Sequence, residues 1–365
     1  MKIGFDAKRA FHNVTGLGNY SRSVIESISE IRKNDELYLM TPKINHNNFF
    51  VKNKNIHIIT PGRFTNKSYW RFIGINRKIK KLKLDVYHGL SNEIPYGINT
   101  KSIVTIHDLL FLKYPNFYNY VDRKIYHIKS QLACENANYI IATSKQTKAD
   151  IINFFNINEN KIKIIYQSCH QAFIMHSENF ILNKEIKTHL INPFILYVGS
   201  IEERKNLLFL LKALQHTKKE IRLICVGKKG KYFNKINSFI SKNKLTNRVV
   251  FLNIQDVNTL AILYRKSRGL VYPSINEGFG IPIVEGMYSK IPVITSNQPI
   301  FKEVGGQNSY YFETGNLDSL IENINEIWTD SPNKTKRIEA NFKYVQKFNA
   351  KTQATQIIDL YKNLI

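Results

Sequence analysis

The stretch VYPSINEGFGIPIVEGMYSKIPVITSN, residues 271–297, decides the fold class. It begins with a short apolar strand that ends at Pro273, and a loop with two glycines follows. Pro282 then stands in the first turn of a helix, where no backbone donor is needed, and a second strand over 291–295 comes after that helix. Strand, glycine loop, helix and strand form a βαβ unit. The sequence therefore predicts an α/β protein built on parallel sheets.

Two glutamates of this unit are candidate ligand-binding residues. Glu277 lies in the loop at the carboxyl end of the strand, and Glu285 lies about one turn into the helix. Gly278 and Gly280 between them allow backbone N–H groups to point outward, and the helix N-terminus adds positive potential. A ligand there would meet amide donors suited to phosphate or hydroxyl oxygens and two carboxylates suited to sugar hydroxyls. Each glutamate alone also has a plainer explanation, since Glu285 favours the positive end of its helix and Glu277 caps the loop.

The pattern Glu277-x7-Glu285 within PSINEGFGIPIVEGM resembles the signature of the retaining glycosyltransferases of family 4, which have the GT-B architecture. The chain looks most like the bacterial group 1 enzymes that extend O-antigen or other surface polysaccharides, many of which use GDP-mannose. The resemblance implies two Rossmann-like domains whose parallel sheets face each other across a cleft. It also implies that Glu277, with Gly278, Phe279 and Gly280, lies against the donor sugar and that Glu285 holds the ribose.

The length and composition fit a two-domain globular protein. A chain of 365 residues is too long for one ordinary core, and 43% of its residues are hydrophobic. No apolar run approaches the length that spans a bilayer, and MKIGFDAKRA at the N-terminus indicates a strand rather than a signal peptide. The three cysteines are far apart and lack metal-ligand spacing, which indicates reduced thiols. We therefore expect a cytoplasmic protein, peripheral at the inner face of the plasma membrane.

The formal net charge of +25 favours an anionic partner, which is either nucleic acid or an acidic membrane surface. Abundant lysine, asparagine and isoleucine also fit an AT-rich genome, which would explain part of the excess. Because no motif of a known nucleic-acid-binding module occurs, we expect no nucleic-acid partner.

A helix predicted over residues 69–83 carries the most concentrated positive charge. Its buried stripe consists of Phe72, Ile75, Ile79 and Leu82. Its other face carries six cations beside two aromatic residues, namely Arg71, Arg77, Lys78, Lys80, Lys81 and Lys83 with Tyr69 and Trp70. Such a face suits anionic lipid head groups, where each cation near the surface contributes about 1 kcal/mol. We expect peripheral membrane contact through this segment.

The chain divides into two predicted domains. Residues 1–172 predict an N-terminal, acceptor-side Rossmann-like domain, and residues 193–349 a C-terminal domain that binds the sugar nucleotide. Periodicity is poor over 173–192, where we place the connection between them. As in GT-B proteins generally, the final helix, about 350–365, is expected to pack back on the N-terminal domain.

Two N-terminal segments are candidate site residues. Gly16-x-Gly18 lacks the third glycine of the dinucleotide fingerprint, so it is a weak nicotinamide signal. Similar glycosyltransferases bring such a loop close to the donor phosphates, and an ordinary strand-to-helix turn is an equal alternative. His107 follows a strand over 102–106 and faces the crevice where α/β folds bind ligands. The segment TIHDLLFLKYP resembles the family segment whose histidine approaches the reacting sugar, whereas His88 is expected to be structural.

The loop GSIEERKN, which begins at Gly199, is the candidate diphosphate site. Arg204 and Lys205 are adjacent cations beside a helix N-terminus, an arrangement that favours an anion. Fixed cations there would stabilise the charge that develops on a departing nucleoside diphosphate. By resemblance, the nucleobase lies near residues 253–256 and is held largely by backbone groups.

Together these patterns predict a retaining hexosyltransferase that needs no metal and no cofactor, since no Asp-x-Asp pair occurs. The expected substrates are a sugar nucleotide, with mannose from GDP-mannose favoured, and a glycan or lipid-linked oligosaccharide, with polyprenyl diphosphate as the expected carrier. The catalytic candidates are His107, Glu277, Arg204 and Lys205. The alternatives are a UDP- or dTDP-sugar donor, a GT-B epimerase or phosphorylase, and a basic nucleic-acid-binding protein. The last would explain the charge but not the paired glutamates.

Overall fold

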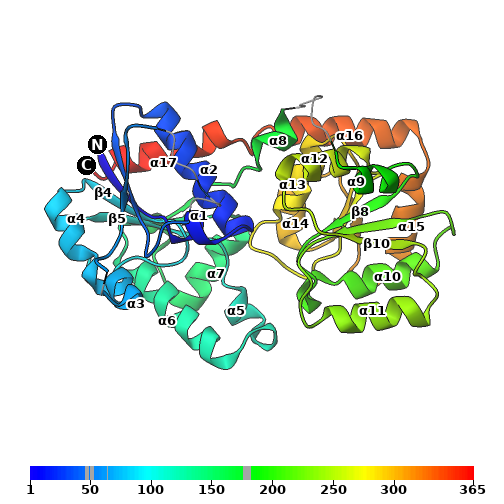
Figure 1. Ribbon diagram of the computed structural model, residues 1–365, viewed down its shortest axis with the longest axis horizontal. Coiled ribbons are helices and arrows are strands. Elements are labelled where there is room, and N and C mark those ends of the chain that lie inside the picture. The colour runs from blue at the N-terminus through cyan, green and yellow to red at the C-terminus, as the bar shows by residue number, and fades with distance from the viewer. Residues whose placement is uncertain (46–48, 50–52, 64, 176–181) are drawn as a thin grey trace. The chain divides into compact units, whose positions relative to one another are not determined.

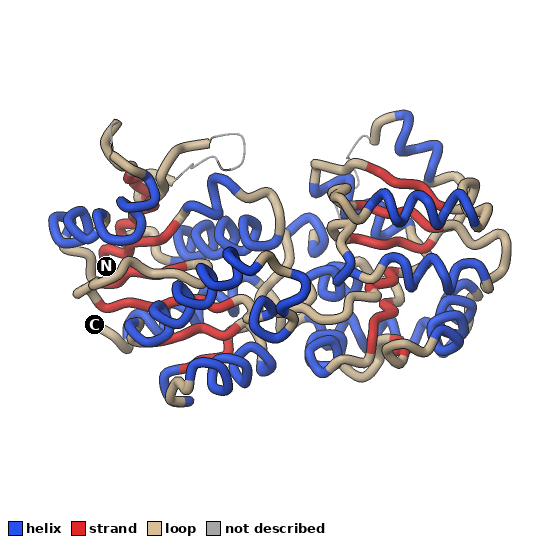
Figure 2. Tube along the Cα trace, turned by 90° about the horizontal axis from the view of Figure 1, so that it is seen from below, coloured by secondary structure: helices blue, strands red, loops and turns tan. Residues whose placement is uncertain are grey.

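The computed structural model describes residues 1–45, 49, 53–63, 65–175 and 182–365. The chain divides into two compact units, one formed by Met1–Ser168 with Phe348–Ile365 and the other by Cys169–Lys347 (Figure 1). Each unit is a parallel sheet flanked by helices (Figure 2). Of the connection predicted over 173–192, residues 176–181 lie outside the described part of the chain. Short helices of the second unit, α8 (Gln171–Ile174) and α9 (Lys184–His189), lie on either side of them.

The first unit is organised around a seven-stranded sheet with the strand order β3-β2-β1-β4-β5-β6-β7. The strands are β1 (Lys2–Asp6), β2 (Glu36–Met40), β3 (Ile56–Ile59), β4 (Val86–Gly89), β5 (Lys101–Ile106), β6 (Tyr139–Ala142) and β7 (Ile162–Ile164). All neighbours pair in parallel, as the buried apolar runs predict. The order reverses between β1 and β4, and such a switch point is where open α/β sheets bind ligands.

Helices cover this sheet, and the last helix of the chain is one of them. The helices are α1 (Lys8–His12), α2 (Gly16–Ile31), α3 (Lys67–Tyr69), the π-helical turn η1 (Trp70–Gly74), α4 (Asn76–Leu82), α5 (Leu110–Lys113), α6 (Tyr120–Asn136), α7 (Lys145–Phe155) and α17 (Ala350–Lys362), with 3-10 turns η2 (Pro115–Phe117) and η3 (Glu159–Lys161). In Figure 1, α17 runs beside α2. Val24 and Ile28 of α2 share one core cluster with Ile357 and Tyr361 of α17, so the last helix is part of the core of this unit.

His88 illustrates how α17 is anchored in this unit. Its Nδ1 lies 2.7 Å from the Tyr361 hydroxyl and its Nε2 lies 2.9 Å from Thr105 Oγ1. Burial lowers the pKa of His88 to about 3, so the imidazole is neutral at physiological pH. The structural role predicted for His88 is confirmed.

The prediction of one continuous α-helix over 69–83 is wrong for its first half. Ile75 N–H donates to the Trp70 carbonyl at 2.7 Å, an i to i−5 bond that inserts a π turn between α3 and α4. The wider turn changes which side chains face the sheet. Trp70 and Arg71 are turned inward, and only Ile75 and Ile79 of the predicted buried stripe are fully buried. Arg71 is therefore not one of the exposed cations, and Phe72 is 37% exposed.

The second unit repeats the same architecture with a six-stranded sheet of order β10-β9-β8-β11-β12-β13. Its strands are β8 (Ile195–Val198), β9 (Leu223–Val226), β10 (Val249–Leu252), β11 (Leu270–Tyr272), β12 (Val293–Ser296) and β13 (Tyr310–Phe312). Besides α8 and α9, its helices are η4 (Glu203–Lys205), α10 (Leu207–Gln215), α11 (Phe233–Lys242), α12 (Val257–Lys266), α13 (Ile281–Tyr288), α14 (Pro299–Gly305), α15 (Leu317–Trp328) and α16 (Pro332–Val345). The switch point of this sheet lies between β8 and β11. Within the described ranges, no helix combines the length and apolarity needed to cross a bilayer.

Candidate active site

Two loops leave the carboxyl ends of β8 and β11, the strands on either side of the second switch point. The first carries η4 and the second runs over residues 273–280. Ile275 N–H donates to the carbonyl of Arg204 at 2.9 Å, and Ser274 Oγ lies 3.3 Å from the same oxygen. The backbone therefore holds the two loops against each other before any ligand binds.

Arg204, Lys205 and Glu277 meet between these loops, together with Ser274. We call these four residues the Arg204 cluster. Glu277 Oε1 accepts from Lys205 Nζ at 2.5 Å and from Ser274 Oγ at 2.6 Å, and it lies 2.7 Å from Arg204 Nη1. The structure thus brings together three of the side chains singled out in the sequence, and it adds Ser274 to them.

The electrostatics of the Arg204 cluster keep Glu277 ionised. Burial raises the pKa of Glu277, but the charges of Lys205 and Arg204 outweigh burial and lower that pKa to about 2. Arg204 Nη1 also donates to the Asn276 carbonyl at 2.8 Å, and Lys205 Nζ donates to the Tyr272 hydroxyl at 3.2 Å. Two cations against one carboxylate leave a net charge of +1 on a preorganised frame, which suits a phosphate-bearing ligand.

Glu285 is anchored by different neighbours. It lies in α13, is 9% exposed, and accepts a hydrogen bond of 2.7 Å from the Tyr264 hydroxyl of α12. Phe173 of α8 packs edge-on against the Tyr264 ring at 5.2 Å between centroids. Burial raises the pKa of Glu285 to about 7, although the hydrogen bond from Tyr264 opposes that rise. The carboxyl of Glu285 is therefore poised to change its protonation near neutral pH.

We expect the Glu285→Gln substitution to change how stability depends on pH. Because the folded-state pKa lies above the ordinary 4.5, the contribution of Glu285 is fully present below about pH 4.5 and is lost as the pH rises through about 7. That difference corresponds to about 3 kcal/mol. In urea denaturation, the free energy of unfolding of the wild type should fall by up to this amount between pH 4.5 and 8, relative to that of the variant. Glu322→Gln, at an exposed position of α15, is the matched control, and a difference that is independent of pH would contradict the buried, proton-binding state.

The backbone around the two glutamates depends on one glycine in particular. Gly280 precedes α13 with φ of +104°, a conformation that side-chain-bearing residues rarely adopt. Phe279 beside it is buried. In the other loop, a Cβ on Gly227 would lie 1.8 Å from the Gly199 carbonyl oxygen. The backbone of Gly199 therefore packs directly against Gly227, which follows β9. That the amides of Gly278 to Gly280 face a ligand stays a prediction.

The two predicted glycines of the first unit, Gly16 and Gly18, differ in how closely other atoms pack against them. A Cβ on Gly18 would lie 1.7 Å from the Asn13 carbonyl oxygen, so the turn into α2 requires glycine there. A Cβ on Gly16, the first residue of α2, would meet no atom within 4 Å. Local packing therefore accounts for Gly18, and contact of either glycine with a donor stays a prediction.

His107 follows β5 and is buried with both ring nitrogens engaged. Its Nε2 lies 2.9 Å from the Leu90 carbonyl oxygen and its Nδ1 lies 3.3 Å from Gln167 Nε2. The ring of Tyr20 from α2 packs edge-on at 4.6 Å between centroids. Burial lowers the pKa of His107 to about 4, so the imidazole is neutral and, in this bonding pattern, donates from Nε2. Its predicted catalytic role stays a prediction.

Comparison with known proteins decides the family. Residues 179–344 match the family described as Glycosyl transferases group 1, and residues 16–168 match Glycosyltransferase Family 4. The chain is a glycosyltransferase that carries a group 1 domain and a family 4 domain. It is 27% identical to the O-antigen chain mannosyltransferase RfbU of Salmonella typhimurium over 332 residues, which cover 86% of this chain and 88% of that protein. It is 25% identical to the O-antigen chain mannosyltransferase B of Escherichia coli over the whole of both chains.

The fold comparison agrees with the family. Sucrose-phosphate synthase from Thermosynechococcus elongatus superposes on this glycosyltransferase with a TM-score of 0.80 at 19% identity, over 100% of this chain and 99% of the other. This likeness concerns the fold alone, and it confirms the GT-B architecture that the sequence resemblance implied. The predicted glycosyltransferase class is likewise confirmed by the family and the relatives.

The sequence did not single out several residues that contact the candidate site residues. Ser274 stands in the quoted stretch, three residues before Glu277, yet a serine in a loop gives no signal by itself. Tyr264 is 21 residues from Glu285 and lies on another helix. Gln167 is 60 residues from His107. Only the fold brings these partners together. Among the residues that the structure describes, no group of three or more His, Cys, Asp or Glu is placed to hold a metal ion.

Proposed function

We propose that this glycosyltransferase transfers a hexose, with mannose from GDP-mannose favoured, to a growing surface polysaccharide carried on polyprenyl diphosphate. The proposed reaction retains the anomeric configuration and requires no metal. The Arg204 cluster carries the proposal, because it places a guanidinium, an ammonium and a carboxylate at the switch point of the second sheet. The two O-antigen chain mannosyltransferases, which align with most or all of this chain, support mannose as the donor sugar.

The proposed roles follow from the charges. The bond between the anomeric carbon and the diphosphate breaks, and Arg204 and Lys205 stabilise the negative charge left on the diphosphate. An oxygen of that leaving phosphate takes the proton of the acceptor hydroxyl, and the new glycosidic bond forms on the same face of the sugar. No covalent nucleophile is required. Because Oε1 of Glu277 already accepts hydrogen bonds from Lys205 and Ser274 and forms an ion pair with Arg204, we assign its Oε2 to a hydroxyl of the hexose.

Glu285 is assigned to the ribose hydroxyls of the nucleotide. Hydroxyl groups that donate to a carboxylate favour its ionised form, so nucleotide binding should lower the raised pKa of Glu285. Its hydrogen bond from Tyr264 already holds the carboxyl in place at 2.7 Å. His107, as a neutral imidazole, is assigned to the region of the reacting sugar on the strength of the family resemblance.

Peripheral membrane contact through residues 69–83 is part of the proposal. With Arg71 buried, five of the six predicted cations remain on this segment, and Tyr69 is 59% exposed beside them. Exposed aromatic rings next to lysines suit an anionic lipid surface. Flotation with liposomes should require anionic lipid, and flotation that does not depend on lipid charge would remove this part of the proposal.

The experiment that tests the proposed function is transfer from labelled GDP-mannose to a short polyprenyl-diphosphate-linked oligosaccharide. We expect transfer to continue in excess EDTA and the new linkage, read by NMR, to keep the α configuration of the donor. Turnover of a UDP- or dTDP-sugar instead would favour the alternative donors. Conversion of a sugar nucleotide without any acceptor would favour an epimerase or phosphorylase, and loss of transfer in EDTA would contradict the metal-independent scheme.

A further inference from the structure

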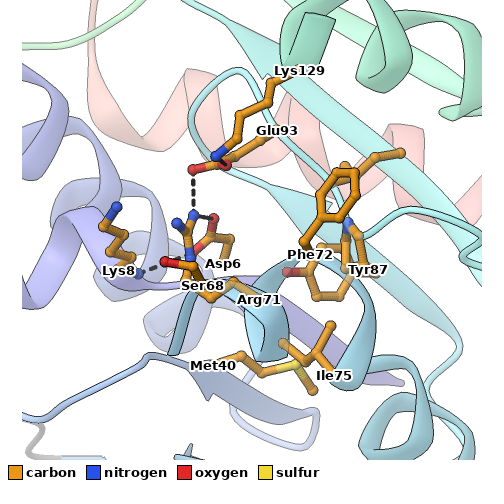
Figure 3. A pocket seen from close by; sticks show the side chains of 12 residues that line it. Asp6, Lys8, Met40, Ser68, Arg71, Phe72, Ile75, Tyr87, Glu93 and Lys129 are labelled. Carbon is orange, nitrogen blue, oxygen red and sulfur yellow. Dashed lines mark hydrogen bonds and ion pairs between the residues drawn. The ribbon is translucent and has the colours of Figure 1, made fainter. Parts of the chain in front are cut away.

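The switch point of the first sheet also holds a group of charged side chains. Asp6 ends β1, and Glu93 follows β4, the neighbouring strand across the reversal of strand order. Between them lies a cavity of about 100 Å³. About 10–15 Å³ is enough to hold one water molecule, so the cavity is several times larger than that. We call it the Arg71 chamber (Figure 3), and its lining includes Asp6, Lys8, Arg71, Phe72, Glu93 and Lys129. None of these residues belongs to the site assigned above.

A chain of ion pairs runs through the Arg71 chamber. Arg71 Nη2 lies 2.7 Å from Asp6 Oδ2 and also pairs with Glu93 Oε1, while Lys129 Nζ lies 3.0 Å from Glu93 Oε2 (Figure 3). Burial raises the pKa of Glu93, but the charges of Arg71 and Lys129 outweigh burial and hold it well below its usual range. Acceptors and donors therefore alternate through the chamber, and Glu93 stays ionised at physiological pH.

Stability of the fold alone is a weak explanation for these charges. Replacing buried ion pairs with apolar residues of similar volume is often neutral or stabilising, so such pairs are commonly kept for another reason. Arg71 also has its Nε buried with no hydrogen-bond partner among the described residues, which is costly for a charged donor. Both observations fit a chamber that is completed by a polar ligand.

An aromatic platform stands at the rim of the chamber. Phe72 stacks on Tyr96 with 5.7 Å between ring centroids and 17° between ring planes, and Tyr96 N–H donates to the Phe72 carbonyl at 2.7 Å. A smaller hollow of about 10 Å³ beside it is lined by both rings and by Leu132 of α6. It shares Phe72, Glu93 and Lys129 with the chamber, so a polar interior and an apolar rim are continuous.

We propose that the Arg71 chamber is a saccharide subsite that binds one sugar residue of the acceptor glycan. That it is the acceptor's sugar rests on the proposed function, whereas saccharide binding itself does not. Each sugar hydroxyl both donates and accepts a hydrogen bond, and the alternating carboxylates and cations supply both kinds of partner. The apolar face of the pyranose ring would pack on Phe72 and Tyr96.

A free anion suits the chamber less well than a neutral sugar. Arg71 is already shared between Asp6 and Glu93, so a phosphate would have to approach two carboxylates to reach the guanidinium. A neutral polyol requires no charge to be displaced. The competing explanation is that Arg71 only clamps the π turn η1 to the sheet, in which case the rim aromatics would contribute nothing to ligand binding.

The test is saturation-transfer NMR on the full chain with a panel of methyl glycosides of mannose, galactose, glucose and N-acetylglucosamine, without any nucleotide sugar. We expect at least one glycoside to bind with a Kd of about 1 mM. Phe72→Ala and Glu93→Gln should each weaken that binding about tenfold, and in the transfer assay they should raise KM for the acceptor but not for the donor. Phe154→Ala is the matched control, because Phe154 is a comparably exposed phenylalanine of α7 that does not line the chamber.

Each outcome decides between the two explanations. If no glycoside binds, or if Phe72→Ala and Phe154→Ala behave alike, the cluster is a structural clamp and the proposal is wrong. Phe72 is half-exposed, so its replacement preserves the fold even where Glu93→Gln destabilises it, and urea denaturation checks both variants. A thermal-shift series with GDP- and UDP-sugars on the same samples separates the two proposals. A nucleotide shift without glycoside binding overturns only the subsite, and glycoside binding without any nucleotide shift overturns only the proposed function.

Discussion

Replacing Glu277 with glutamine should reduce transfer by about 10²–10³-fold while GDP binds at least as tightly as it does to the wild type. The two effects differ because Glu277 has two functions in the structure. Its Oε1 neutralises part of the charge of Lys205 and Arg204 at 2.5 and 2.7 Å, and we assign its other oxygen to the hexose. Glutamine raises the net charge of the Arg204 cluster from +1 to +2, which favours a diphosphate. It also removes the carboxylate that we assign to the sugar.

The measurement pairs calorimetric titration of GDP with the transfer assay. We expect the Kd for GDP to stay the same or fall by up to about tenfold, a change of about 1.4 kcal/mol. Glu203→Gln is the matched control, because it removes the same charge from an exposed position in the neighbouring loop, beside Arg204. Full turnover in Glu277→Gln, or equal effects of the two substitutions on GDP binding, would contradict the assigned roles.

The sequence predicts the sheets better than it predicts the loops, and the reason is physical. Buried parallel strands are continuous apolar runs, so β1, β8 and β11 can be located from composition and from the residues that end them. Loops that leave the carboxyl ends of neighbouring parallel strands lie at the same edge of the sheet. Once strand order is known, this places Arg204, Lys205 and Glu277 beside one another. Strand order itself came from the family resemblance, since nothing in the chain says which strands are neighbours.

Arg71 shows where local periodicity fails. A spacing of 3.6 residues assigns it to the exposed face of a helix, but one i to i−5 hydrogen bond at Ile75 turns it inward onto Asp6 and Glu93. A signal for the chamber was nevertheless present, because Asp6 ends the first strand and a carboxylate at that position faces the ligand-binding edge. Glu93, which shares Arg71 with Asp6, is 87 residues from Asp6 in sequence. The two carboxylates become neighbours only when β1 pairs with β4.

Replacing Lys205 with alanine should lower kcat about 10²–10³-fold, corresponding to about 2.7–4 kcal/mol of transition-state stabilisation. Lys205 donates to Glu277 and to the Tyr272 hydroxyl, and both contacts hold its ammonium where the diphosphate is proposed to depart. Because the negative charge on the diphosphate grows as the glycosidic bond breaks, the loss should fall on kcat more than on KM for the donor. Lys212→Ala, an exposed lysine of α10, is the matched control.

The same substitution should also move the acid limit of activity. Lys205 is the stronger of the two charges that outweigh burial and hold the pKa of Glu277 at about 2. Without it, that pKa rises, and Glu277 takes up a proton at a higher pH than in the wild type. The stability that ionised Glu277 contributes is present above its ordinary pKa and is lost as the pH falls through the folded value, so the variant should lose it at less acidic pH. A pH–rate profile of the variant whose acid limb coincides with that of the wild type would show that Lys205 does not control the charge of Glu277. A variant that raises KM alone would place Lys205 in ground-state binding instead of the transition state.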